Sequence, residues 1–185
     1  MRRPLLLTAC VLLAGCGNAQ QQPPDVSTVA RPSGTTPIAF DAQGIRFAAP
    51  GGWHVRDGQA PLVATVQSGP AQIAVWRYPR TEQLPVTHSS LQAAKLALVA
   101  QIQKRDSSFK VRRAKLLHVG PKRAVQVLGL GTINGNKRMI RSTHIYTEKA
   151  EYVVDAYAPQ TVFDRVDKGV FAPVLASLEI TKPRA

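Results

Sequence analysis

Cysteine is almost absent from this chain. Its 185 residues include two cysteines, Cys10 and Cys16, and both lie close to the N-terminus. The remainder of the chain therefore cannot use disulfides, thiolate catalysis or cysteine-ligated zinc. Histidine is also sparse, with four copies and no His-x-x-x-His spacing. We therefore predict no metal site, and no bound cofactor.

Acidic residues are the second shortage. The chain has 11 Asp and Glu against 24 Lys and Arg, and no acid lies between Asp106 and Glu148. A basic field of this kind attracts anionic partners, and the alternative is surface charge that serves only solvation. The acid-free stretch carries nine bases: Lys110, Arg112, Arg113, Lys115, Lys122, Arg123, Lys137, Arg138 and Arg141.

Familiar catalytic motifs are missing as well. The chain has no Gly-x-Ser-x-Gly elbow and no glycine-rich phosphate loop that opens a helix. Paired carboxylates, as in glycoside hydrolysis, stay open because such pairs converge from distant sequence positions. We predict that the protein is not an enzyme.

A short apolar run near the N-terminus ends in Leu13-Ala14-Gly15-Cys16. Two arginines precede the run, and residues 4–13 are too few for a helix that spans a bilayer. The run is therefore predicted to be a secretory signal. Its last four residues resemble the bacterial lipobox, which implies cleavage after Gly15 and a diacylglycerol thioether on Cys16. An ordinary secretory cleavage site is the alternative.

The lipobox resemblance implies where the protein resides. A lipidated Cys16 anchors the chain to a membrane of the bacterial cell envelope, and Gly17 after it implies the outer membrane, facing the periplasm, if the source is Gram-negative. Anionic partners in that compartment are lipid head groups, anionic wall polymers or an acidic face of another protein. Nucleic acid is excluded as a partner.

Composition divides the chain into four segments. Residues 1–15 are the predicted signal, and residues 16–37 comprise the lipidated cysteine and a disordered tether rich in Gln, Pro, Ser, Thr and Gly. Residues 38–180 are long enough for one domain, and residues 181–185 form a loose tail.

The predicted domain is of the α+β class. A hairpin is expected around Asp41, and an amphipathic helix from Ser89 or Ser90 to Arg105. Two shorter helices, broken at Gly169, end the domain. Together these elements predict an antiparallel sheet of about six strands, with a C-terminal meander, flanked by helices on both faces. The main predicted strands are residues 62–66, 73–78, 109–118, 123–133, 137–148 and 152–157.

Asn134-Gly135 is a strong signal for a two-residue hairpin loop. Such a loop sets Leu130 opposite Met139, Leu128 opposite Arg141 and Val125 opposite His144. Two further glycines, Gly129 and Gly131, then leave a gap in side chains on one face. A packed helix could fill the gap, or a ligand could occupy it.

Two motifs resemble the PsbP and Mog-type superfamily. They are the opening Phe47-Ala48-Ala49-Pro50-Gly51-Gly52-Trp53 and a closing helix that runs from Phe171 into Ser177-Leu178-Glu179-Ile180. The resemblance covers residues 38–180. It implies an antiparallel sheet between helices, used for accessory and protein-binding roles, and it brings no catalytic residues.

Together these features predict a lipid-anchored, non-enzymatic accessory or binding module. Its partner is a protein or an anionic envelope polymer, contacted through a basic region of the sheet, since crowded like charges are unfavourable without an anion. The alternative is a carrier that holds a lipid or other apolar ligand between the sheet and a helix, which an enclosed apolar cavity would favour. Candidate binding residues are Lys122, Arg123, Lys137, Arg138 and Arg141.

Overall fold

The structure is a computed structural model, and it describes residues 27–184. The predicted signal, Cys16 and the first part of the predicted tether lie outside the described residues. The strands are β1 (Thr35–Phe40), β2 (Ile45–Pro50), β3 (His54–Asp57), β4 (Leu62–Ser68), β5 (Ala71–Pro79), β6 (Lys110–Val119), β7 (Lys122–Ile133), β8 (Asn136–Tyr146), β9 (Ala150–Ala158) and β10 (Glu179–Ile180). The helical segments are η1 (Asp41–Gln43), α1 (His88–Arg105), α2 (Gln160–Val166), the π-helical turn η2 (Asp167–Phe171) and α3 (Ala172–Ala176).

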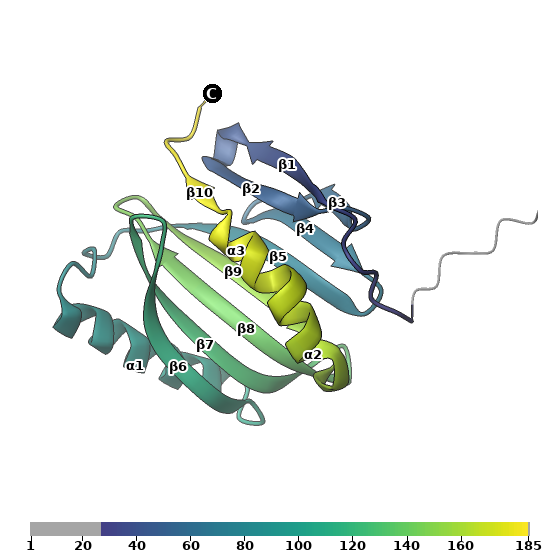
Figure 1. Ribbon diagram of the computed structural model, residues 1–185. Coiled ribbons are helices and arrows are strands. Elements are labelled where there is room, and N and C mark those ends of the chain that lie inside the picture. The colour runs from purple at the N-terminus through teal and green to yellow at the C-terminus, as the bar shows by residue number, and fades with distance from the viewer. Residues whose placement is uncertain (1–26, 185) are drawn as a thin grey trace, which may run out of the picture.

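Seven strands form one antiparallel sheet in the order β3-β4-β5-β9-β8-β7-β6 (Figure 1). The predicted C-terminal meander is confirmed, because β6 to β9 follow one another as antiparallel neighbours. The large sheet has seven strands where about six were predicted, and the second sheet was not predicted. The β1–β2 hairpin pairs with β10 in a separate three-stranded sheet, and β10 has two residues, too few to show an alternating pattern in the sequence.

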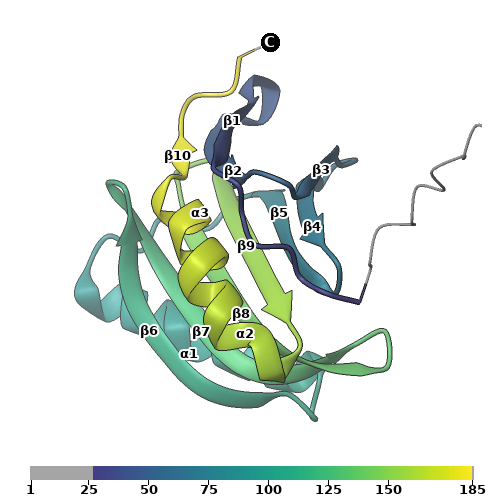
Figure 2. The same ribbon diagram turned by 45° about the vertical axis from the view of Figure 1, so that its right-hand side comes forward.

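Helices cover both faces of the large sheet, as predicted (Figures 1 and 2). Leu98 of α1 packs in a cluster with Val125 of β7, whereas Phe163 of α2 packs in another cluster with Ala124. Neighbouring residues of a strand point to opposite faces, so α1 and the C-terminal helical segment lie on opposite sides.

The start of α1 differs by a small step from the prediction. Thr87 is the N-cap: its hydroxyl accepts the Ser90 N–H at 3.0 Å, and the Ser90 hydroxyl accepts the Thr87 N–H at 3.0 Å. Ser90 therefore occupies the third helical position of a reciprocal capping arrangement, rather than the cap itself.

The C-terminal helical segment does not break at Gly169, contrary to the prediction. The backbone stays helical through the π-helical turn η2 into α3. Pro173 lacks the N–H that would reach the carbonyl of Gly169 and its ring crowds that carbonyl, so a wider turn just before it accommodates both defects.

The predicted Asn134-Gly135 loop is confirmed. Both residues have positive φ, 49° and 75°, as a tight two-residue hairpin turn requires. The register follows the prediction: Leu128 lies opposite Arg141, and Val125 lies opposite His144. Leu130 likewise lies opposite Met139.

Phe109, the residue before β6, fills the gap predicted beside the two strand glycines. A Cβ placed on Gly129 would lie 2.3 Å from Phe109 Cε1, and one on Gly131 would lie 2.8 Å from Phe109 Cδ2. The aromatic ring thus takes the space that a ligand would need.

The chain is held against the domain earlier and later than predicted. Val29 is buried, the Ala30 N–H donates to Ser68 Oγ at 2.9 Å, and Trp53 Nε1 donates to the Ala30 carbonyl at 3.2 Å. Residues 27–37 therefore do not belong to a tether. In the predicted loose tail, the Thr181 N–H donates to the Gly44 carbonyl at 2.9 Å. Polar segments of this kind are fixed by backbone hydrogen bonds that composition does not reveal.

Candidate anion-binding site

The five predicted binding residues do not gather in one patch. Lys122 and Arg123 begin β7, whereas Arg138 pairs with Gly131, further along β7 by 131 − 122 = 9 residues. At about 3.3 Å per residue, the two groups lie about 30 Å apart. Lys137 is beside Arg138 at the far end. The strand register divides the set between opposite ends of the sheet, with Arg141 between them.

Arg141 is already paired within the fold. Its guanidinium forms an ion pair with Asp167 of the C-terminal helical segment, and both side chains are 17% exposed. Burial raises the pKa of the Asp167 carboxyl, and Arg141 opposes that effect. Removing the aspartate would leave a mostly buried cation, so Arg141 fixes the helical segment to the sheet rather than waiting for a ligand.

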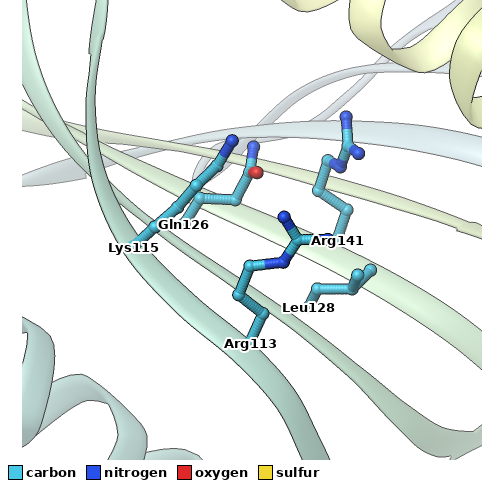
Figure 3. Close-up of a pocket in the computed structure, with 5 residues that line it drawn as sticks. All are labelled: Arg113, Lys115, Gln126, Leu128 and Arg141. Atoms are coloured by element: carbon cyan, nitrogen blue, oxygen red, sulfur yellow. The ribbon is translucent and has the colours of Figure 1, made fainter.

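A small hollow lies beside Arg141 on the face of the sheet that carries the C-terminal helical segment (Figure 3). Arg113 and Lys115 of β6 project over it next to Gln126 and Leu128 of β7. Gln126 is buried and donates its amide hydrogen to Thr143 Oγ1 at 2.9 Å. The hollow holds ≈ 40 Å³, so it suits a water molecule or a small ion.

A much larger groove surrounds Lys122 and Arg123. It is an open groove of ≈ 840 Å³ between the β6–β7 turn, the β8–β9 turn and the segment that follows β10. Five of the residues that line it are Lys or Arg, and one, Glu148, is acidic. The five cations are Arg77, Lys122, Arg123, Lys149 and Lys182. We call this the basic groove.

Apolar and aromatic side chains form the rest of the basic groove. Leu84 and Ile180 line it, together with several prolines. Its Tyr152 is held rigidly: the hydroxyl donates to the Gln43 carbonyl at 2.6 Å, and Arg77 Nε donates to that hydroxyl at 3.4 Å. A groove with apolar walls and exposed cations at its rim fits an anionic chain that also has apolar or sugar surfaces.

Sequence reasoning found two of the groove's cations and missed three. Arg77 comes from β5, Lys149 from the β8–β9 turn, and Lys182 from beyond β10. None lies in the acid-free stretch that drew attention to the others. Arg77 lies near the β8–β9 turn because β5 pairs with β9, a long-range contact that the local sequence pattern does not contain.

A second groove, between α1 and the sheet, holds a chain of polar groups. Ser142 Oγ lies 3.0 Å from His144 Nε2, and His144 Nδ1 lies 2.6 Å from Glu151 Oε1. The order hydroxyl, imidazole, carboxylate is the one that activates serine in hydrolases. However, Ser142 also hydrogen-bonds the carboxyl of Asp155, whose pKa is raised by burial.

That fourth group argues against acyl transfer at Ser142. Once ionised, the Asp155 carboxylate would repel the negative oxygen of a tetrahedral intermediate, which such catalysts must stabilise. The chain of bonds instead joins β8, which carries Ser142 and His144, to β9, which carries Glu151 and Asp155. We assign it to the stability of the sheet.

Within residues 27–184, no helix combines the length and apolar character needed to cross a membrane. In the same part of the chain, no three His, Cys, Asp or Glu side chains come together as metal ligands would.

Comparison with known proteins shows the fold. No protein family matches the chain by sequence, and no curated protein matches it. Among solved structures, it is similar to the cyanobacterial PsbP protein CyanoP of Synechocystis, with a TM-score of 0.59 and 13% identity over 91% of this chain and 98% of that one. It is also similar to LpqN, involved in cell envelope biogenesis of Mycobacterium tuberculosis, with a TM-score of 0.58 and 17% identity over 80% of this chain and 91% of that one.

The fold is therefore the α+β fold of CyanoP and LpqN, in agreement with the resemblance to PsbP. At these identities, the likeness concerns architecture, and function has to be argued from the site. In this chain the site that carries the argument is the basic groove with its five cations.

Proposed function

We propose that this chain is a lipid-anchored protein of the bacterial envelope that binds an anionic envelope component in the basic groove. The observation that carries the proposal is the lining of the groove, with five Lys and Arg against one acid over ≈ 840 Å³. Like charges at this density repel one another, and an anionic ligand turns that repulsion into attraction.

The envelope assignment has two supports. Leu13-Ala14-Gly15-Cys16 resembles the lipobox, which implies lipid on Cys16, and Gly17 implies the outer membrane, facing the periplasm, if the source is Gram-negative. LpqN, which shares the fold, takes part in cell envelope biogenesis in its own organism. A non-enzymatic role as an accessory or binding module fits both supports.

The ligand is best described as an anionic polymer or the acidic face of a protein. Arg123, Lys149 and Lys182 are exposed at the rim of the groove. Contacts of exposed charges are screened over about 8 Å at physiological salt, so binding strength should come from several weak contacts along an extended ligand. An extended polyanion can reach all the rim cations at once.

The packing argues against the alternative of a lipid carrier. Part of the space between the sheet and α1 is occupied by Leu91, Leu98 and Ile102, which pack on the valines of β7. The groove that remains there is lined largely by polar and charged side chains, among them Arg80, Glu151 and Asp155. On the other face, Phe163 and Phe171 pack together with ring centroids 5.9 Å apart. A carrier of an apolar ligand would need an apolar cavity, whereas these interfaces are packed or, in the groove beside α1, polar.

The test compares two variants that carry the same change of charge. The protein without its signal and anchor would be sedimented with peptidoglycan, lipopolysaccharide and anionic vesicles at two salt concentrations. Lys122→Glu/Arg123→Glu should lose retention on the anionic polymers, and Lys137→Glu/Arg138→Glu should keep it, because the second pair lies outside the basic groove. Wild-type retention should fall steeply as salt rises. Equal retention of the two variants would show that the groove is not the binding site.

The anchor has a separate test. Cys16→Ala should release the protein into the soluble fraction and abolish labelling by radioactive lipid precursor. A variant that remains in the membrane fraction would overturn the lipid anchor. In a Gram-negative source, sucrose-gradient fractionation should place the wild-type protein with the outer membrane.

A further inference from the structure

One rim of the large sheet lies where the described chain begins. The Ala30 N–H bonds to Ser68, the residue before the β4–β5 turn. Arg138 lines a hollow together with Gly69 of that turn and Asn134 of the β7–β8 turn. The two turns and the start of the described chain therefore lie side by side, as Figure 2 shows. We call this edge of the domain the tether rim.

The segments around the two turns carry bases and no acids. Residues 27–34, 66–73, 131–140 and 156–160 contain three Lys and Arg and no Asp or Glu. The three bases are Arg31, Lys137 and Arg138. Asp106 lies further along the same edge, in the segment before Phe109, which contacts Gly131.

The basic groove lies at the opposite rim. Lys122 starts β7, the end of the strand remote from the β7–β8 turn, and Lys149 lies in the β8–β9 turn. The nine steps along β7 from Lys122 to Gly131, the partner of Arg138, span about 30 Å. Each rim thus has its own group of cations, separated by most of the length of the sheet.

The chain between the proposed anchor and the tether rim is short. Between Cys16 and Ser27 there are 26 − 17 + 1 = 10 residues. Ten residues span at most about 36 Å when fully extended. A flexible coil of ten residues averages about 17 Å. This segment carries one charged residue, Asp25, so it offers little to offset the bases of the rim.

We infer that the tether rim rests on the anionic lipid surface that holds the anchor and that the basic groove faces away from it. The inference builds on the proposed lipid anchor and deepens the proposed function. If the rim lies on the head groups, the groove opens about 30 Å above them. Its ligand is then a component beyond the membrane, such as a wall polymer or a protein, and not the lipid of the same leaflet.

Electrostatic attraction and the short connection to the anchor together favour this orientation. Each Lys or Arg close to an anionic membrane strengthens attachment about five-fold. Lys137 and Arg138 together therefore favour this orientation about 25-fold over one with no cation at the surface. The basic groove has more cations, but it lies about 30 Å further from the end of the ten-residue connection, which favours contact by the tether rim. The attraction acts within a Debye length of about 8 Å, which the far rim cannot reach while the near rim touches the membrane.

Energy transfer to the membrane would test the orientation. The full lipidated protein would be placed in vesicles of phosphatidylcholine with or without phosphatidylglycerol and with an acceptor-labelled lipid. The mature chain has no cysteine besides Cys16, so Thr132→Cys at the tether rim and Pro121→Cys beside the groove each provide one exposed site for a donor dye. Transfer should be strong from position 132 and weak from position 121 when phosphatidylglycerol is present. Equal transfer from both, or stronger transfer from position 121, would overturn the inference.

Charge-reversal variants connect the orientation to the rim. Lys137→Glu/Arg138→Glu should reduce transfer from position 132 in phosphatidylglycerol vesicles towards its value in phosphatidylcholine alone. Lys122→Glu/Arg123→Glu, with the same change of charge, should leave that transfer unchanged. The opposite ranking of these variants would also overturn the inference.

Flotation with the vesicles tests the lipid anchor separately from the orientation. Protein that fails to float with the vesicles would overturn the lipid anchor, and the orientation with it. Protein that floats but shows equal transfer from both positions would overturn the orientation and leave the groove's binding of polymer to be judged by sedimentation.

Discussion

The contact between Phe109 and Gly131 gives the sharpest prediction about the fold. Phe109 is 9% exposed, and truncation of a buried aromatic residue to alanine costs about 3–5 kcal/mol. A Cβ on Gly131 would lie 2.8 Å from Phe109 Cδ2 and 2.9 Å from Ile140 Cδ1. Overpacking of this kind costs about 1–3 kcal/mol, so each single variant should be clearly destabilised.

The double variant should be more stable than the sum of the two single-variant effects on the unfolding free energy predicts. Without the Phe109 ring, the new methyl group meets only the flexible end of Ile140, and alanine in place of glycine gains about 0.5–1 kcal/mol in a strand interior. The coupling between Phe109→Ala and Gly131→Ala should therefore be about 2 kcal/mol.

Urea unfolding of the four proteins at 25 °C would measure this coupling, provided that the slopes agree. Gly169→Ala is the control, because a Cβ there meets nothing within 4 Å and its effect should be independent of Phe109. Additivity within about 0.5 kcal/mol for Phe109 and Gly131 would show that the ring does not occupy the gap.

Three further predictions follow from features of the fold. Gly135→Val should lower the melting temperature in calorimetry, because valine at φ 75° costs about 1–2 kcal/mol, and an unchanged value would indicate a different loop. Arg141→Leu should lower the unfolding free energy by about 3 kcal/mol in urea, because it leaves Asp167 buried without its partner. Arg141→Leu/Asp167→Leu should recover most of that loss, and no recovery would contradict the ion pair. Burial raises the pKa of Asp155, so the folded state binds the proton of this carboxyl more tightly than the unfolded state does. The unfolding free energy should therefore fall as pH rises above 3.8, and in Asp155→Asn this part of the pH dependence should disappear. Identical pH profiles for the two proteins would contradict the burial of Asp155.

Local signals were enough to predict the meander. Asn134 and Gly135 tolerate positive φ, and the alternating residues on either side of them then determine which side chains face one another. Such information lies within a few residues of the turn, so a single sequence contains it. The same reasoning could not detect β10, whose two residues pair with β2 from far along the chain.

The candidate site depended on contacts that local patterns do not encode. A run of bases without acids drew attention to Arg141, yet its counter-ion Asp167 lies on a helical segment 26 residues away. Conversely, Lys182 lies in a predicted loose tail, and the backbone hydrogen bond from its neighbour Thr181 to Gly44 brings it to the groove. Charge counts along a sequence thus indicate that a basic surface exists, and tertiary pairing decides which charges remain available.

Because β6 is the last strand in the sheet order, it bears on whether the protein aggregates in solution. An outermost strand of ten residues exposes backbone groups that a second copy could pair with, which is a common beginning of aggregation. Flanking lysines and arginines make such pairing unfavourable, because two copies would bring rows of positive charge together. Four of the ten residues of β6 are of this kind, so part of the chain's excess of base protects an exposed edge, whatever the protein binds elsewhere. The four are Lys110, Arg112, Arg113 and Lys115.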